Sequence, residues 1–220
     1  MKNNVKEAYR QSKNIYDDVL TQNKWWSKLY IDFFWGVRDV EITKKLFSFI
    51  ADDFSGKLLD VPCGTINQTA EKYVKLRNAD ITCLDYSEDM LEVARTRVKR
   101  QNLSNVSTLQ GDVGKLPFED NTFDAVLSMN GFHAFSDKKR AYNEIARVLK
   151  TDGMFCGCFY ICGENRRSDF VVNSILARKG WFNPPFQTKE EVYETLQKYY
   201  INIEIYSDQA MVWFRCENVK

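Results

Sequence analysis

The sequence predicts an α/β fold built on a parallel β-sheet. From residue 57 onward, short apolar runs alternate with amphipathic stretches, which is the pattern of βαβ units. Several of these apolar runs end in an acidic residue followed by a turn. The 220 residues suffice for one buried core, so we expect a single domain over 1–220.

The first 55 residues are predicted to form a helical cap. Six aromatic side chains fall within eleven positions between Trp25 and Trp35, and aromatic residues at this density need to be covered. They form either the core packing of the cap or a lid over a binding site.

The core and the C-terminal part divide into strands and helices by their apolar periodicity. A turn at Asp152-Gly153 is expected to end the third core helix, and Pro184-Pro185 interrupts the chain after a helix that ends near residue 177. The predicted strands are 57–61, 80–84, 106–110, 123–129 and 154–161, with a closing hairpin of 201–206 and 211–216. The other predicted helices are 68–76, 88–101, 138–149 and 189–199.

The charge balance argues against a polyanionic partner. Thirty-one Lys and Arg residues against thirty Asp and Glu leave a net charge of +1, so neither nucleic acid nor a membrane is an expected partner. The N-terminus lacks a signal-peptide-like apolar stretch, and the six cysteines have the placement of reduced thiols, which favours a cytoplasmic location.

The turn after the first strand indicates a nucleoside ligand without a phosphate. Ligands of parallel sheets bind at the carboxyl ends of the strands, and here Asp60 ends a strand just before Gly64. The turn holds a single glycine, so it matches neither a dinucleotide-binding loop nor a P-loop, and NAD is disfavoured.

Two further acids end predicted strands. Asp85 is suited to accept hydrogen bonds from ribose hydroxyls, and Asp112 to accept one from an adenine amino group. Either acid alone could be an ordinary turn residue. Three acids at the same edge favour a nucleoside site.

The stretch 57–159 resembles the core of the class I S-adenosylmethionine-dependent methyltransferases, in particular the small-molecule group that includes the ubiquinone and menaquinone enzymes. The motifs that carry the resemblance are LLDVPCGTI, ITCLDYSEDML and GDVGKLPFEDNTFDAVLS. The resemblance implies a Rossmann-like, seven-stranded sheet with its last strand antiparallel and helices on both faces. It also implies S-adenosylmethionine (SAM) as cofactor and a small-molecule methyl acceptor.

The resemblance assigns the cofactor-binding residues. The turn after the first strand would hold the methionine end, Asp85 the ribose, and Tyr86 and Met90 the adenine walls. The full set is Tyr16, Asp60, Pro62, Cys63, Gly64, Asp85, Tyr86, Met90, Gly111, Asp112, Val113 and Asn130. Pro62 and Ile66 stand where the family usually has glycines, and either could weaken cofactor binding.

His133 is the candidate catalytic residue. It is the only histidine and lies three residues beyond Asn130, in the loop expected to face the transferred methyl group. An imidazole titrates near neutral pH, so it could take a proton from the acceptor. Alternatively, it packs against Phe132 and Phe135 or only shapes the pocket.

Several functional points stay open. The acceptor pocket is expected to involve the cap and residues 165–187. A nucleoside-binding protein without turnover would show the same motifs, and a methyltransferase of RNA or protein is a weaker alternative, because no Asn-Pro-Pro-Tyr motif ends the fourth strand. The chain is expected to be a monomer or a homodimer.

Cys156, Cys158 and Cys162 could bind a soft metal, but their alternation favours burial, so we expect no metal.

Overall fold

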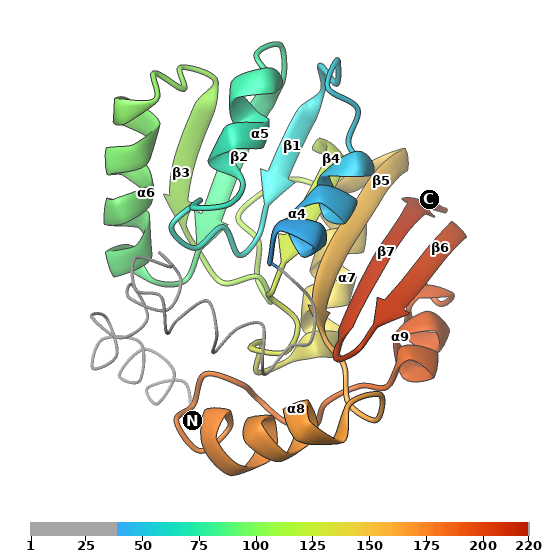
Figure 1. The fold of residues 1–220 in the computed structure, drawn as a ribbon. Coiled ribbons are helices and arrows are strands. Elements are labelled where there is room, and N and C mark those ends of the chain that lie inside the picture. Colours follow the sequence, from blue (N-terminus) through green and yellow to red (C-terminus); the bar gives the residue numbers. More distant parts are fainter. Residues whose placement is uncertain (1–38, 220) are drawn as a thin grey trace.

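The structure, a computed structural model, describes residues 39–219 as a seven-stranded sheet with strand order β3-β2-β1-β4-β5-β7-β6 (Figure 1). Strands β1 to β5 pair in parallel, and β7 is antiparallel to both of its neighbours, β5 and β6. This arrangement confirms the predicted Rossmann-like fold and the closing hairpin. The strand order reverses between β1 and β4, so the loops that follow these two strands diverge.

The predicted elements are present with small changes at their ends. The strands are β1 (Lys57–Asp60), β2 (Asp80–Asp85), β3 (Val106–Gln110), β4 (Phe123–Met129), β5 (Leu149–Tyr160), β6 (Tyr200–Asp208) and β7 (Met211–Asn218). The helices are α4 (Asp39–Ser48), α5 (Ala70–Lys75), α6 (Glu88–Arg100), α7 (Lys138–Val148), α8 (Arg166–Val171), the π-helical turn η1 (Val172–Leu176) and α9 (Lys189–Leu196).

The start of β5 corrects one expectation. The strand begins directly after α7, whereas the sequence placed a turn at Asp152-Gly153 between them. Leu149 pairs with Phe123, and the ladder between β4 and β5 then shifts before Met154 pairs with Ala125. Asp152 has a φ of 61° within this irregular stretch. The turn signal therefore marks a bulge within a strand and not the end of a helix.

Helices cover both faces of the sheet, as predicted (Figure 1). Neighbouring residues of a strand point to opposite faces: Leu58 belongs to the core cluster that includes residues of α4, α5 and α6, and Leu59 to the cluster that includes residues of α7 and α9. Both side chains are fully buried. Cys156 and Cys158 lie together in the first cluster, so the expected burial on one face is confirmed.

The described part of the predicted cap packs on the sheet. Ile42 and Leu46 of α4 are buried, and the indole nitrogen of Trp213 donates to the carbonyl oxygen of Ile42 at 3.1 Å. Tyr16 and the aromatic residues from Trp25 to Trp35 lie outside the described residues. Whether they form a lid stays a prediction.

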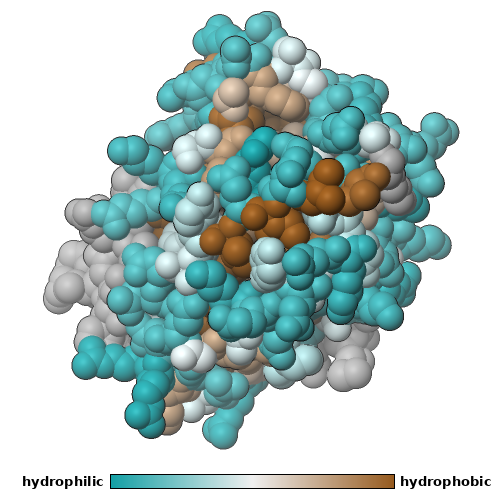
Figure 2. Space-filling model, turned by 90° about the vertical axis from the view of Figure 1, so that its right-hand side faces the viewer, coloured by the Kyte–Doolittle hydropathy of each residue, from teal (hydrophilic) through white to brown (hydrophobic). Residues whose placement is uncertain are grey.

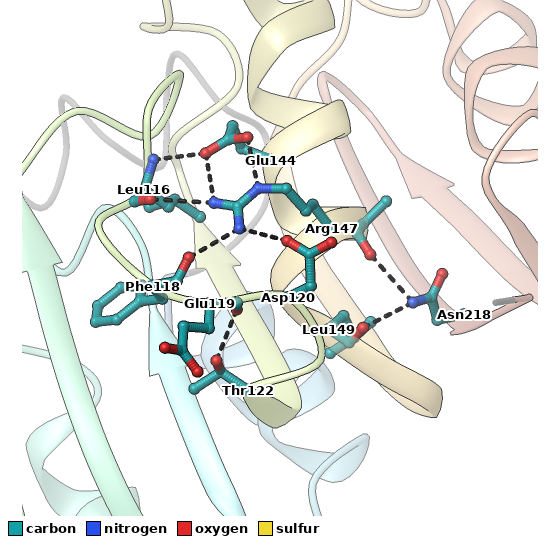
Figure 3. A network of polar contacts seen from close by, with 10 residues as sticks. Leu116, Phe118, Glu119, Asp120, Thr122, Glu144, Arg147, Leu149 and Asn218 are labelled. Carbon is teal, nitrogen blue, oxygen red and sulfur yellow. Dashed lines mark hydrogen bonds and ion pairs between the residues drawn. The ribbon is translucent and has the colours of Figure 1, made fainter.

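The loop between β3 and β4 is fastened to α7 by a polar network (Figure 3). The guanidinium of Arg147 donates to the carbonyl oxygens of Phe118 at 2.8 Å and Leu116 at 3.1 Å. It also pairs with Glu144, whose carboxylate accepts from the backbone N–H of Leu116 at 2.7 Å. The hydrogen bonds from Arg147 hold the pKa of Glu144 below its usual value. This loop begins next to Gly111, at the edge of the sheet where the ligand was predicted.

The surface on the β6 side is mostly hydrophilic, with a small apolar band (Figure 2). On β6, Ile201 is 46% exposed, while Ile203 and Ile205 are half-buried against the core. No helix within residues 39–219 is long and apolar enough to cross a membrane.

Candidate functional site

A cavity of about 670 Å³ lies at the carboxyl edge of the parallel strands. Its walls come from the loops that follow β1, β2, β3 and β4, and from the segment 177–184. Eleven of the twelve residues predicted to bind a cofactor line it, and the twelfth, Tyr16, lies outside the described residues. The eleven are Asp60, Pro62, Cys63, Gly64, Asp85, Tyr86, Met90, Gly111, Asp112, Val113 and Asn130.

Asp60 carries a buried carboxyl with one unused oxygen. Its Oδ2 accepts from the hydroxyl of Tyr73 at 2.5 Å, whereas Oδ1 has no hydrogen-bond partner within residues 39–219. The side chain is 1% exposed, and burial raises its pKa to about 7. A buried, unpaired carboxylate oxygen is costly, so its presence in a cavity wall suits a ligand that donates to it.

Asp85 organises the turn after β1. Its Oδ2 accepts from the backbone N–H of Gly64 at 2.8 Å, and its Oδ1 accepts from the N–H of Ser87 at 2.8 Å. Burial raises the pKa of Asp85, and these backbone donors oppose the shift by stabilising the carboxylate. Each carboxylate oxygen has a second lone pair, so Asp85 can still accept from a ligand.

Gly64 leaves space for a ligand beside this turn. Its φ is 53°, in the left-handed region where glycine is favoured, and a Cβ added there would meet no atom of residues 39–219 within 4 Å. The backbone at Gly64 can therefore be approached closely from the cavity.

The two departures from the family pattern have different consequences. Ile66 lines the cavity, but its side chain is 1% exposed and belongs to the core cluster. It adopts a φ of 50°, which is unfavourable for a β-branched residue and is offset by burial. Pro62 lies so close to Gly131 that a Cβ on Gly131 would overlap its ring. The loops after β1 and β4 are thus in direct contact.

The loops after β2 and β3 form the other end of the cavity. Met90 is nearly buried at the start of α6, and Tyr86 is 44% exposed. The N–H of Gly111 donates to the carbonyl oxygen of Asp85 at 3.0 Å, and Asp112 Oδ1 accepts from the N–H of Gly114 at 2.9 Å. These contacts fix the backbone at the place where the sequence predicts an adenine.

Asn130 marks the end of β4 in the cavity. Its φ of 56° lies in the left-handed region, which asparagine tolerates better than most residues. Its N–H donates to the carbonyl oxygen of Cys158 at 2.7 Å. The chain consequently turns sharply here and places the loop that contains His133 beside β5.

His133 lies behind the wall of the cavity and does not line it. Its Nδ1 accepts from the N–H of Tyr160 at 3.3 Å, and its ring stacks on Phe182 at 3.9 Å between centroids. Burial, together with the charge of Lys138, lowers the pKa of His133 to about 3. A histidine with this pKa is a weak base near neutral pH, so the geometry favours the structural alternative over acid–base catalysis.

The segment 177–184 supplies cavity residues that the sequence did not single out. It contributes Phe182 and Asn183, while Phe135 and Arg140 come from the loop after β4 and from α7. The sequence assigned acceptor contacts to 165–187 only as a whole. No local signal pairs Phe182 with His133, because the two are brought together by tertiary packing.

The sequence and the fold match those of known methyltransferases. A protein-family model described as a methyltransferase domain matches residues 59–157. These residues are a class I methyltransferase domain. The matched segment contains the end of β1, all of β2 to β4 and most of β5, and with them the loops after β1 to β4 that line the cavity.

Curated relatives of this chain include proteins named demethylmenaquinone methyltransferases. The demethylmenaquinone methyltransferase of Staphylococcus haemolyticus is 35% identical over 149 residues, which cover 64% of this chain and 59% of the relative. The corresponding protein of Staphylococcus aureus is 34% identical over 152 residues, covering 69% of this chain and 55% of the relative. The chain thus spans a little over half the length of these relatives.

A solved structure shows the same fold over nearly the whole chain. A SAM-dependent methyltransferase from Thermotoga maritima superposes with a TM-score of 0.71 at 18% identity, covering 97% of this chain and 99% of the other. At this identity the similarity concerns the fold.

Proposed function

We propose that this protein transfers a methyl group from SAM to a small, largely apolar acceptor. The observation that carries the proposal is the cavity at the carboxyl edge of the methyltransferase domain, where Asp60 ends β1, Asp85 ends β2 and Asp112 follows β3, and all three line one pocket. A volume of about 670 Å³ is within the range of small-molecule sites.

The residues present fit the donor. SAM carries an ammonium group, two ribose hydroxyls and an adenine amino group, all of which donate hydrogen bonds. The free Oδ1 of Asp60 suits the ammonium, and the spare lone pairs of Asp85 suit the hydroxyls. The open space at Gly64 admits the ligand next to the backbone.

The chain's own contribution to the reaction is binding and orientation. SAM supplies a methyl group already activated on a sulfonium. The donor is held by Asp60, Asp85 and the turn at Gly64. The loop after β4 contributes Asn130 and Phe135 to the cavity wall. Most of the rate then comes from alignment of the acceptor and exclusion of water, with no dedicated base required.

The lining beyond the donor site indicates an apolar acceptor. Met129, Ala134, Phe135, Phe182 and Pro184 contribute to the cavity wall. Apolar and aromatic walls favour planar, weakly polar ligands. The relatives named demethylmenaquinone methyltransferases support a reduced quinone as the first acceptor to test.

The proposal is tested by methyl transfer from labelled SAM to a short-chain demethylmenaquinol. We expect acceptor-dependent incorporation of label by the wild-type protein. If S-adenosylhomocysteine (SAH) binds but neither this quinol nor other small phenols become labelled, the proposed activity is wrong and a binding protein without turnover is the better account.

Asp85→Ala tests the proposed contact between Asp85 and the ribose of the donor. The variant removes the acceptor for the ribose and for the N–H of Gly64, so SAH affinity should fall by about 2–3 kcal/mol in calorimetry. Asp80→Ala, at the exposed opposite end of β2, should leave affinity unchanged. Equal affinities of both variants would contradict the ribose assignment.

The remaining predictions concern the whole protein. We expect a cytoplasmic monomer or homodimer, which cell fractionation and light scattering can check.

A further inference from the structure

The wall of the cavity formed by segment 177–184 is held by contacts to the loop after β4. The N–H of Asn183 donates to the carbonyl oxygen of His133 at 2.7 Å, and the Nζ of Lys138 donates to the carbonyl oxygen of Asn183 at 2.7 Å. The ring of Phe182 stacks on the ring of His133 with an angle of 6° between their planes. Hydrogen bonds and ring stacking thus join two segments about fifty residues apart in sequence.

Lys138 connects two backbone carbonyl groups through hydrogen bonds. Besides Asn183, its Nζ donates to the carbonyl oxygen of Phe135 at 3.3 Å, so it bridges the two segments. Its side chain is partly buried, and this burial lowers the pKa of Lys138 to about 8. Neighbouring Lys139 is exposed.

His133 is itself fixed on the sheet. The N–H of Tyr160, the last residue of β5, donates to Nδ1 and so orients the ring that supports Phe182. Tyr160 also meets Phe182 edge to face at 5.7 Å. The position of Phe182 therefore depends on a rigid strand through two aromatic contacts.

Residues 179–181 are held by backbone hydrogen bonds to residues 175–177, and the chain beyond Asn183 offers fewer donors. Pro184 and Pro185 lack N–H groups, so they cannot donate hydrogen bonds. Gly180 has a φ of 75°, a conformation that glycine adopts easily. The contacts of Phe182 and Asn183 help to hold the part of the wall beyond residue 181.

We propose that His133 and Lys138 are positioning residues for the methyl acceptor: they hold Phe182 and Asn183 in the cavity wall and so determine acceptor affinity, while donor affinity is set elsewhere. The acceptor part of this inference rests on the proposed function. The structural part, that these two residues hold the wall, does not depend on any reaction.

Hydrogen exchange tests the wall without turnover. In Lys138→Met, the Asn183 amide should exchange about tenfold faster or more in NMR measurements, because one side of its restraint is lost. SAH affinity should stay within about twofold, since no donor-site contact changes. The control Lys139→Met should behave as wild type. Equal exchange in the two variants would overturn the proposed role of Lys138.

Two substitutions of His133 separate positioning from base catalysis. His133→Phe keeps a ring to stack on Phe182 but removes every proton acceptor, and His133→Ala removes both. A positioning role predicts turnover within about threefold of wild type for His133→Phe, and for His133→Ala a KM for the acceptor raised about tenfold with the KM for SAM unchanged. A loss of about 100-fold in turnover for His133→Phe would overturn it in favour of a general base.

The two sets of results also distinguish the underlying proposals. If wild-type protein methylates none of the acceptors tested, the proposed function fails, but the exchange of Asn183 still decides whether Lys138 holds the wall. If methylation occurs and the exchange of Asn183 is unaffected in Lys138→Met, only the positioning inference fails.

Discussion

Asp60 experiences two opposing influences at the donor end of the cavity. Burial disfavours the carboxylate and raises its pKa to about 7, while the hydrogen bond from the hydroxyl of Tyr73 partly stabilises the charged form. The group is therefore only partly ionised near neutral pH. Because an ammonium group pairs with the carboxylate and not with the acid, donor binding and the ionisation of Asp60 are coupled.

This coupling predicts a pH dependence of donor binding. Between about pH 6 and pH 8 the ionised fraction of Asp60 rises roughly tenfold, so SAH affinity should rise by about the same factor. In Asp60→Asn, calorimetry should find this dependence lost. His133, with a pKa of about 3, is already uncharged throughout this range, so its titration cannot produce the pH dependence. An undiminished pH dependence in Asp60→Asn would exclude Asp60 as the titrating group.

The raised pKa of Asp60 makes folding stability change with pH in the opposite direction from donor binding. The folded-state pKa of Asp60 lies above the ordinary value of 3.8, so the folded protein holds its proton more tightly than the unfolded chain. The resulting stabilisation is complete below about pH 4 and is lost as the pH rises through about 7. Donor binding and stability of the free protein thus change in opposite directions over this range.

The sequence was sufficient to predict those cavity residues whose location depends on where a strand ends. Asp60, Asp85 and the turn at Asp112 meet at one edge because parallel strands end there. The surroundings of His133 and Ile66 could not be predicted, because they depend on side chains far away in sequence. A single sequence contains no signal for such contacts.

At the scale of elements, the loop between β3 and β4 depends on α7. The guanidinium of Arg147 is 27% exposed and bonds to two backbone carbonyl oxygens as well as to Glu144 and Asp120 (Figure 3). Such a hydrogen-bonded cation contributes more than an exposed ion pair.

Arg147→Met should therefore lower the free energy of unfolding by about 2–3 kcal/mol, because the backbone groups of the loop lose their donor. The matched control is Arg95→Met, which removes an ion pair with Glu88 whose side chains are 39% and 45% exposed. This control should cost clearly less, because an exposed ion pair contributes little. Urea denaturation measures the free energy of unfolding of both variants. A larger decrease for Arg95→Met than for Arg147→Met would contradict the conclusion that Arg147 holds the loop between β3 and β4.

Element boundaries were predictable where periodicity and turns agree. The bounds of β3 and β4 match the predicted ranges at both ends. The start of β5 was missed because Asp152-Gly153 reads as a turn, although the chain there forms a bulge that pairs again with β4. Local turn preference does not distinguish a bulge from the end of a helix.

At the scale of the whole molecule, the cavity walls formed by the loops after β1, β2 and β3 could be predicted from sequence motifs, and the wall formed by segment 177–184 could not. The first walls come from consecutive βα loops, whose arrangement is fixed by the parallel sheet. The opposite wall comes from a segment that follows β5 and returns to the loop after β4. Its position depends on the fit of Phe182 and Asn183 to tertiary partners, which no periodic pattern encodes.

The central claim, that the cavity is a SAM site, is tested most directly by isothermal titration calorimetry of the purified chain with SAH, SAM and NAD. We predict micromolar-range affinity for both adenosyl ligands and no detectable binding of NAD, because the turn from Asp60 to Gly64 offers a carboxylate and a single glycine where a pyrophosphate would need several backbone donors. Absence of binding by SAH at about 1 mM, with the fold intact by circular dichroism, would contradict the account.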